Sequence, residues 1–414
     1  MKNNFLKKAL IIFLILFDCF VFRYTSTDNM YFFVSIIIIL FNAILIGGFL
    51  IKDKSESDKR INIIIFVSFI IRIFIMLLDI FGYNLVFSGM DSESFYRAAI
   101  GEIIFPHNYV YFLKNLFFFV GNSRLAAEYL NTILSLFSIL SIKKICKLLN
   151  VKDNFFPIAL FALAPVNILL SGCLLRESIM IFLNCLSLLY FVKWYKTNKL
   201  SNFLISCILV FLSAWFHSGM IIGILGYGLF YILYNHKTDS INFHRSTFLA
   251  IAIVFSVFII LYKLFGNSVT LYFNKIKTLE DIGAIRDIGN TDYLTFITTP
   301  NSILQLLVWS PLKLIYFYFS PMPWDCYSFG TVAVFLFSST IYIFLFYNIL
   351  KNKNKKMISK MLLFLVLLTS LVYSWGTTNA GTAMRHREKL LPFLVVIYAV
   401  ERKEKKYEKG KNNS

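Results

Sequence analysis

Residues 30–51 read MYFFVSIIIILFNAILIGGFLI, a stretch without a single charged side chain. An α-helix rises about 1.5 Å per residue, so a segment of this length reaches across the roughly 30 Å apolar layer of a bilayer. The stretch therefore predicts a membrane-spanning helix.

The whole chain has the same character. Of its 414 residues, 58% are hydrophobic and only 15% are charged, and the mean hydropathy is +0.70. Soluble globular proteins do not have this composition. We therefore expect an all-α, polytopic integral membrane protein in which residues 1–414 form a single transmembrane domain.

Apolar windows of about 15 to 23 residues recur along the chain. Together they predict about twelve transmembrane helices, near residues 5–22, 30–51, 62–82, 125–142, 155–172, 178–192, 201–217, 219–234, 248–265, 329–350, 361–375 and 381–400. No internal repeat, nucleotide-binding glycine motif or His/Cys metal motif accompanies them, so neither nucleotide use nor zinc binding is supported.

The basic residues predict the orientation. About two thirds of the 41 Lys and Arg residues fall at the two ends of the chain or in alternate loops, which places both termini and these loops in the cytoplasm. The run Ile303–Ser320 contains Lys313 and Pro311 and cannot be a further crossing, because the basic loops on either side of it must both be inside. It predicts a re-entrant or interfacial helix within a long outer loop, residues 266–328.

An acidic motif lies in the other large outer loop, residues 83–124. Asp91 and Glu93 form an Asp-x-Glu pair that can take a proton from a hydroxyl or bind a divalent cation, with Arg97 four residues further on. An alternative is an amphipathic surface helix that Ser88 or Asp91 caps. No metal is expected, although a divalent cation at this pair stays open.

Two short hairpins carry further polar groups. Arg176 and Glu177 interrupt an apolar hairpin, where a charge pair costs several kcal/mol unless it is paired or faces water. They form either a structural pair between helices or a cation directed into a polar cavity. His217 lies in a tight turn and is either a structural group or a proton acceptor and phosphate donor.

The third predicted span contains Arg72 and Asp79, seven residues apart and therefore on one helix face. These two side chains either pair with residues on other helices or line a cavity.

Residues 379–400 read NAGTAMRHREKLLPFLVVIYAV, and a helix of spanning length that ends with this apolar run must begin near Gly381. Arg385, His386 and Arg387 then lie in its outer part. These cations suit a multiply charged anion such as a pyrophosphate, although snorkelling to headgroups is the alternative. A spacing of two directs Arg385 and Arg387 to different faces of the helix.

The motifs MDSESFY (90–96), LLRES (174–178), FHSG (216–219) and NAGTAMRHREKLLPF (379–393) resemble, in this order, those of the Wzy and EpsG-type polysaccharide polymerases. That family belongs to the polytopic glycosyltransferases with GT-C-like architecture. The resemblance implies that oligosaccharide repeat units linked to undecaprenyl pyrophosphate are joined on the outer face of the bacterial cytoplasmic membrane, giving O-antigen, capsule or exopolysaccharide. No cofactor is implied, and a flippase and a chain-length regulator are the expected partners.

The resemblance also implies roles for residues. The catalytic residues would be Asp91, Glu93, His217 and Glu177. Pyrophosphate or sugar would be bound by Arg97, Arg176, Arg385, His386 and Arg387. A GT-C glycosyltransferase that uses a polyprenyl-phosphate sugar donor is the alternative enzyme, and a transporter of lipid-linked sugars is an alternative of another class.

Overall fold

A computed structural model describes residues 15–24, 32–51, 56–83, 85, 87–151, 153–241, 252, 256, 294, 303–377 and 379–411. The chain divides into two compact units. Unit 1 comprises Met1–Phe137 and Asn167–Ile179, and unit 2 comprises Ser138–Val166 and Met180–Ser414. The predicted span at 248–265, apart from residues 252 and 256, and most of the predicted outer loop 266–328 lie outside the described residues.

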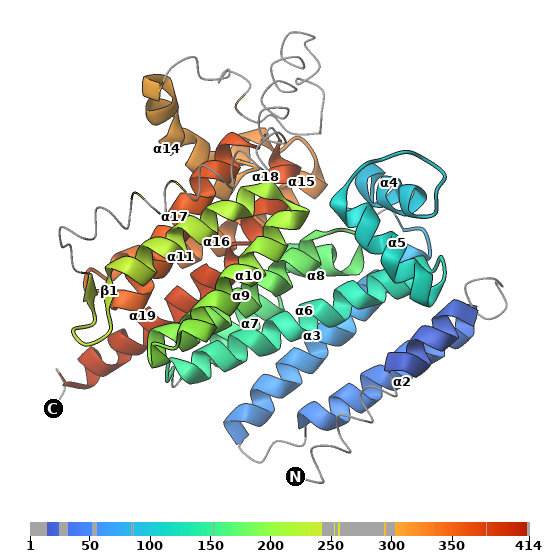
Figure 1. The fold of residues 1–414 in the computed structure, drawn as a ribbon, viewed down its shortest axis with the longest axis horizontal. Coiled ribbons are helices and arrows are strands. Elements are labelled where there is room, and N and C mark those ends of the chain that lie inside the picture. The colour runs from blue at the N-terminus through green and yellow to red at the C-terminus, as the bar shows by residue number, and fades with distance from the viewer. Residues whose placement is uncertain are drawn as a thin grey trace. The chain divides into compact units, whose positions relative to one another are not determined.

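The described residues are almost entirely helical, which confirms the all-α prediction (Figure 1). Among them, the exception is a short antiparallel hairpin of β1 (Tyr234–Asn235) and β2 (Ser240–Ile241) in unit 2.

Unit 1 is built from helices, among them two long neighbouring ones and two shorter ones that pack together. Its elements are a helix at 15–24, α2 (Phe32–Ile51), α3 (Glu56–Ile80), α4 (Met90–Ala99), α5 (Asn108–Val120), the first part of α6 (Arg124–Leu148) and most of α8 (Pro165–Gly172). Helices α2 and α3 lie side by side, and α4 packs on α5 (Figure 1). The predicted outer loop 83–124 thus contains two helices.

Gly172 allows α8 to approach α3 closely within unit 1. A Cβ atom at Gly172 would lie 2.6 Å from the Cγ2 atom of Ile75 and 3.0 Å from the backbone nitrogen of Met76. Only a residue without a side chain fits there.

Unit 2 is built around the last helix of the chain. Its elements are α7 (Phe155–Ala162), α9 (Glu177–Thr197, from Met180 on), α10 (Leu200–Phe216), η2 (Ser218–Ile221), α11 (Ile222–Leu233), α14 (Ile303–Phe319), η3 (Pro323–Asp325), α15 (Phe329–Val334), the π-helical η4 (Phe335–Ser339), α16 (Thr340–Lys351), α17 (Met357–Trp375), α18 (Ala380–Glu388) and α19 (Leu391–Lys411). Helix α19 packs against α7, α16 and α17, and its residues Leu394–Ile397 are fully buried. An apolar helix covered on several sides forms the core of the unit.

The predicted single helix from Gly381 is wrong in one respect, because the structure divides it. Helix α18 ends at Glu388 and α19 begins at Leu391, with a tight turn in which the N–H of Leu390 donates to the carbonyl of Arg387 at 2.9 Å. Pro392 has no N–H group and cannot continue the hydrogen bonds of α18, but it is well tolerated in the first turn of a new helix. The basic residues of the motif therefore lie on a separate short helix.

Six described helices are long and apolar enough to cross a membrane, or up to seven if α7 and α8, which are bent by 46°, form one span. They confirm a membrane-embedded, polytopic protein. The helix predicted over Ile303–Ser320 is also present, as α14, with Pro311 inside it.

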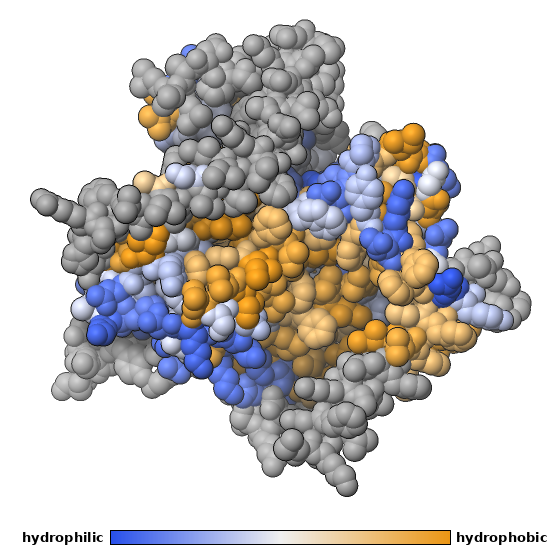
Figure 2. Space-filling model, viewed as in Figure 1, coloured by the Kyte–Doolittle hydropathy of each residue, from blue (hydrophilic) through white to orange (hydrophobic). Residues whose placement is uncertain are grey.

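Large apolar side chains cover the outside of the helices, as a protein surrounded by lipid requires. On α2, Phe33, Ile37 and Ile44 are all more than half exposed. On unit 2, Figure 2 shows an apolar surface over α10 that gives way to hydrophilic residues beside β1.

Candidate functional site

Helix α4 carries the acidic motif of unit 1. Gly89 is its N-cap, and no side chain caps it, so neither Ser88 nor Asp91 has the predicted capping role. Asp91 and Glu93 lie in its first turn, where carboxylates interact favourably with the helix dipole, and both are exposed. The amphipathic surface helix that the sequence offered as an alternative is therefore present, with the two carboxylates on its exposed side.

Arg124, the first residue of α6, fixes this helix. Its guanidinium donates to the carboxylates of Glu93 at 2.9 Å, Asp79 at 2.9 Å and Glu128 at 2.8 Å, and to the hydroxyl of Ser92 at 3.2 Å. The side chains of Asp79 and Glu128 are fully buried, whereas that of Glu93 is 53% exposed. One cation therefore ties α4 to α3 and α6. We call these four charged residues the Arg124 network.

The sequence predicted that Asp79 either pairs with a residue on another helix or lines a cavity, and in the structure it pairs with Arg124 on α6. Neither Arg124 nor Glu128 was identified from the sequence, although their i,i+4 spacing at the start of an apolar window indicates an ion pair on one helix face. Arg72, on the same helix as Asp79, donates instead to the hydroxyl of Ser135 at 2.8 Å and is fully buried.

Arg176 lies beside a histidine that sequence analysis missed. His107 is the N-cap of α5, where its Nδ1 atom accepts the backbone N–H of Tyr109 at 3.0 Å, and its Nε2 atom contacts the guanidinium of Arg176. The carboxylate of Glu177 is 3.9 Å from the Nε atom of Arg176, which is too long for a hydrogen bond. Arg176 thus contacts His107 and, more loosely, its own neighbour.

The environment keeps the His107 ring neutral. Burial of the ring and the positive charge of Arg176 lower the pKa of His107 to about 4, although the nearby Glu177 and Asp91 oppose the shift. The same electrostatic effects place Asp91 and Glu177 in the surroundings of His107. Of the predicted residues of unit 1, Arg176 contacts this imidazole, and Glu177 and Asp91 are close enough to influence its charge.

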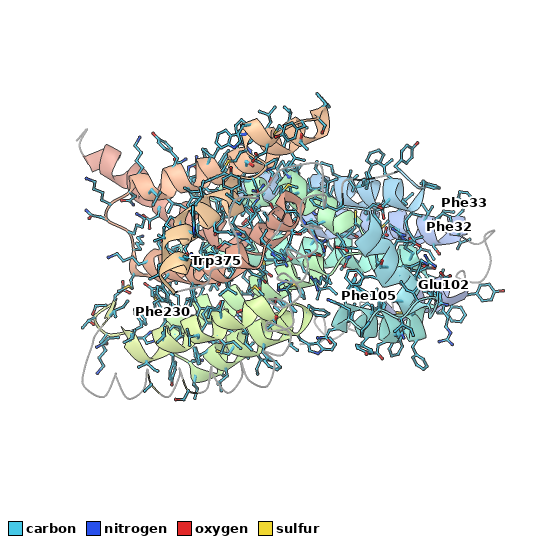
Figure 3. All side chains as sticks on the ribbon, turned by 90° about the horizontal axis from the view of Figure 1, so that it is seen from above. Phe32, Phe33, Glu102, Phe105, Phe230 and Trp375 are labelled. Carbon is cyan, nitrogen blue, oxygen red and sulfur yellow. The ribbon has the colours of Figure 1, made fainter. Side chains whose placement is uncertain are left out.

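Arg97 pairs with a carboxylate outside this group of residues. Its Nε atom donates to Glu102 at 2.9 Å, and both side chains are about half exposed. Figure 3 labels Glu102 together with Phe105 in the segment that joins α4 to α5. An exposed pair of this kind contributes little to stability.

In unit 2, the FHSG and MRHREK motifs meet at one aromatic ring. The ring of Tyr373 on α17 is 5.2 Å from that of His217 and 4.6 Å from that of His386, and the two imidazoles are 4.7 Å apart. The ammonium group of Lys389 lies 5.3 Å from the same ring in a cation–π arrangement. Gly219 allows the turn after His217 to approach the ring of Tyr373 closely, because a Cβ atom at this position would lie 3.2 Å from that ring.

Arg387 is directed away from this group and into the protein. It is fully buried, and its guanidinium donates to the carbonyls of Tyr318 and Ser320, both at 2.7 Å, and to the hydroxyl of Ser338 at 2.6 Å. These contacts hold α18 to the end of α14 and to η4. Arg385, two residues earlier, is only half-buried.

Among the described residues, no group of three or more His, Cys, Asp or Glu side chains is placed to hold a metal ion. Each unit holds its own part of the predicted set: Asp91, Glu93, Arg97, Arg176 and Glu177 in unit 1, and His217, Arg385, His386 and Arg387 in unit 2. No protein-family profile, curated protein or solved structure matches the chain.

Proposed function

We propose that the chain is a polysaccharide polymerase of the bacterial cytoplasmic membrane, with GT-C-like architecture, twelve spans and both termini in the cytoplasm. It would join oligosaccharide repeat units that are carried on undecaprenyl pyrophosphate. In each cycle a hydroxyl of one unit would attack the anomeric carbon of the growing chain, whose pyrophosphate would leave.

The observation that carries this proposal is the contact of Arg176 with His107 in unit 1, together with the charge of Asp91, which is close enough to act on that ring. A carboxylate can take the proton of the attacking hydroxyl, and a guanidinium can hold the oxygens of the departing pyrophosphate. Asp91 and Glu93 are both candidates for the base, and Glu93 also accepts from Arg124. Glu177 would orient Arg176.

The second cationic group supports a polymerase over a single-sugar transferase. His217, His386 and Lys389 surround Tyr373 in unit 2, and Arg385 lies on the same short helix. Polymerisation uses two lipid-linked substrates, each with its own pyrophosphate, whereas a polyprenyl-phosphate sugar donor needs one phosphate site. Arg387, which donates to protein oxygens, would support α18 rather than bind substrate.

The proposal is tested in cells that lack their own polymerase and supply the repeat unit. The wild-type chain should restore a ladder of long surface polysaccharides, while Asp91→Asn, Arg176→Ala and Arg385→Ala should leave single repeat units at normal protein levels. Lys114→Ala changes an exposed residue of α5 and is the matched control, with a full ladder. Full-length chains from all three site variants would refute the site, and addition of one sugar only would indicate the transferase.

The orientation has its own test. In a background without native cysteines, Asn354→Cys should react with a membrane-impermeant thiol reagent only after the cells are opened. Labelling of intact cells would contradict the cytoplasmic position of the loop between α16 and α17.

A further inference from the structure

The Arg124 network contains more acidic groups than basic ones. Its guanidinium donates to the carboxylates of Asp79 at 2.9 Å, Glu93 at 2.9 Å and Glu128 at 2.8 Å. If all three acids were ionised, one positive charge would face three negative charges. Glu93 is 53% exposed and can keep its charge in contact with water, whereas the side chains of Asp79 and Glu128 are fully buried. Because a buried charge without compensation is strongly destabilising, the excess of negative charge concerns these two acids.

The two buried acids bind to the same side of the guanidinium. Glu128 accepts from the Nε atom of Arg124, and Asp79 accepts from its Nη2 atom. The N–H groups of these two nitrogens are parallel and form the fork that usually binds both oxygens of one carboxylate. Here each of them binds a different carboxylate, so the two acids lie next to each other. Asp79 and Glu128 also interact directly as hydrogen-bonding side chains.

A hydrogen bond between two acids requires a proton, because an ionised carboxylate accepts hydrogen bonds but donates none. Two carboxylates that share one site do not both ionise readily, since each negative charge disfavours the other. The contact between Asp79 and Glu128 therefore indicates that one of them is a neutral carboxylic acid.

Glu128 is the acid with an oxygen that a proton can occupy. Among the described residues, no group donates a hydrogen bond to its buried Oε2 atom. Asp79 differs, because its Oδ2 atom accepts from Arg124 and its Oδ1 atom lies 4.0 Å from the thiol of Cys173. A proton on Oε2 of Glu128 would supply the donor that the pair of acids needs.

The groups that face the pair from the neighbouring helices do not balance its charge. From α4, Ser92 contributes a neutral hydroxyl that accepts from Arg124 at 3.2 Å, and Glu93 contributes a further carboxylate. After α8, Cys173 contributes a thiol. The one guanidinium can compensate one buried carboxylate, which leaves the other to be neutralised by a proton.

We propose that Asp79 and Glu128 bind one proton between them, which is held on Oε2 of Glu128 and donated to the carboxylate of Asp79. The Arg124 network is then a proton-binding site between α3 and α6, in which Arg124 compensates the charge of Asp79. The proposal does not depend on the proposed function, because it follows from the charges and contacts within unit 1.

Three substitutions test the position of the proton. Glu128→Gln replaces the neutral acid with a neutral amide, whose oxygen accepts from Arg124 and whose N–H group donates to Asp79. Asp79→Asn leaves Arg124 with one buried carboxylate, so Glu128 should release its proton. Glu93→Gln changes the exposed carboxylate of the same network and is the matched control.

The experiment is infrared spectroscopy of the purified full chain in detergent at neutral pH, in which a protonated carboxylic acid and an ionised carboxylate have separate bands. Relative to wild type, Glu128→Gln should lose one carboxylic acid band and keep its carboxylate absorption, whereas Glu93→Gln should lose carboxylate absorption only. Asp79→Asn should lose the carboxylic acid band with unchanged carboxylate absorption, because the charge removed at Asp79 appears at Glu128.

Thermal stability gives a second test of the same variant. Because the amide reproduces the contacts of the neutral acid, the unfolding temperature of unit 1 in Glu128→Gln should stay within about 4 °C of wild type, whereas loss of an ionised partner would lower it by about 6–20 °C. Unfolding is followed by the reaction of the buried Cys173 with a maleimide. Loss of carboxylate absorption in Glu128→Gln, a carboxylic acid band that survives in Asp79→Asn, or a large loss of stability in Glu128→Gln would each overturn the proposal.

Discussion

Removal of the Arg124 side chain should destabilise unit 1 far more than removal of any one of its exposed partners. In Arg124→Ala, the buried carboxylates of Asp79 and Glu128 both lose their ion pair with the guanidinium, and the half-exposed Glu93 loses its ion pair as well. Truncating one partner of a buried ion pair costs about 3–5 kcal/mol, because a buried charge is left without compensation. An exposed pair is worth about 0–1 kcal/mol, so Glu93→Gln should have a small effect.

Unit 1 offers a thiol that reports on this region. Cys173 is fully buried, with its Sγ atom 4.0 Å from the carboxylate of Asp79. In a chain where Cys173 is the one cysteine left, its reaction with a fluorogenic maleimide during heating follows the opening of unit 1. All five Trp residues belong to unit 2, so intrinsic fluorescence follows that unit in the same sample.

At about 2–4 °C for each kcal/mol, the temperature at which Cys173 reacts should fall by about 6–20 °C in Arg124→Ala and by at most about 4 °C in Glu93→Gln. A triple variant, Arg124→Met with Asp79→Asn and Glu128→Gln, removes the buried charges together and should recover much of the loss. Equal shifts in Arg124→Ala and Glu93→Gln would refute the view that Arg124 stabilises unit 1 through buried charges.

Three further changes have defined outcomes. Gly172→Ala should lower the Cys173 reaction temperature by an amount that corresponds to about 1–3 kcal/mol, because the new methyl group presses on α3, whereas Gly48→Ala has open space around it and should not. Arg387→Lys cannot keep all three hydrogen bonds and should lower the Trp-fluorescence melting temperature of unit 2 more than Arg385→Lys, since each buried acceptor left unsatisfied costs about 1–3 kcal/mol. The pKa of His107 is lowered from 6.5 to about 4, so the stability that its neutral ring contributes is complete above about pH 6.5 and is lost as the pH falls toward 4. Over that window the Cys173 reaction temperature of wild type should therefore fall more than that of His107→Asn.

Hydropathy predicted where helices lie, and the described residues are mostly helical in the predicted windows, although six or seven described helices, rather than twelve, are long and apolar enough to be spans. It did not predict where one helix becomes two. The run that contains Arg385 and ends at Val400 has the length of one span, yet Pro392 and a tight turn after Glu388 divide it. A window average does not register a missing N–H group, although Pro shortly after a polar segment is a recognised sign of a new helix start.

Composition made some residues of the candidate site predictable from the sequence and left others unnoticed. Arg176 and Asp91 stood out because charge is rare in this composition, and a charge in an apolar segment needs a partner or a function. His107 did not stand out, since its role depends on the capping of α5 and on the contact with Arg176 across 69 positions of sequence. Arg124 was overlooked at the start of an apolar window. Its i,i+4 spacing to Glu128 was visible in the sequence, but its pairing with Asp79 and Glu93 on two other helices cannot be read from spacing.

The buried and half-buried arginines differ in the groups that accept their hydrogen bonds. These acceptors, more than burial, indicate which arginines have a structural role. Arg72 and Arg387 are both fully buried, and protein hydroxyls and carbonyls accept from them. Arg124 is matched by carboxylates of its own unit. At Arg176 the guanidinium contacts the Nε2 atom of His107, and the side chain is 17% exposed. The sequence predicted that Arg176 and Arg387 both bind an anion. The carbonyl and hydroxyl partners of Arg387 favour a supporting role for it, whereas anion binding by Arg176 stays a prediction.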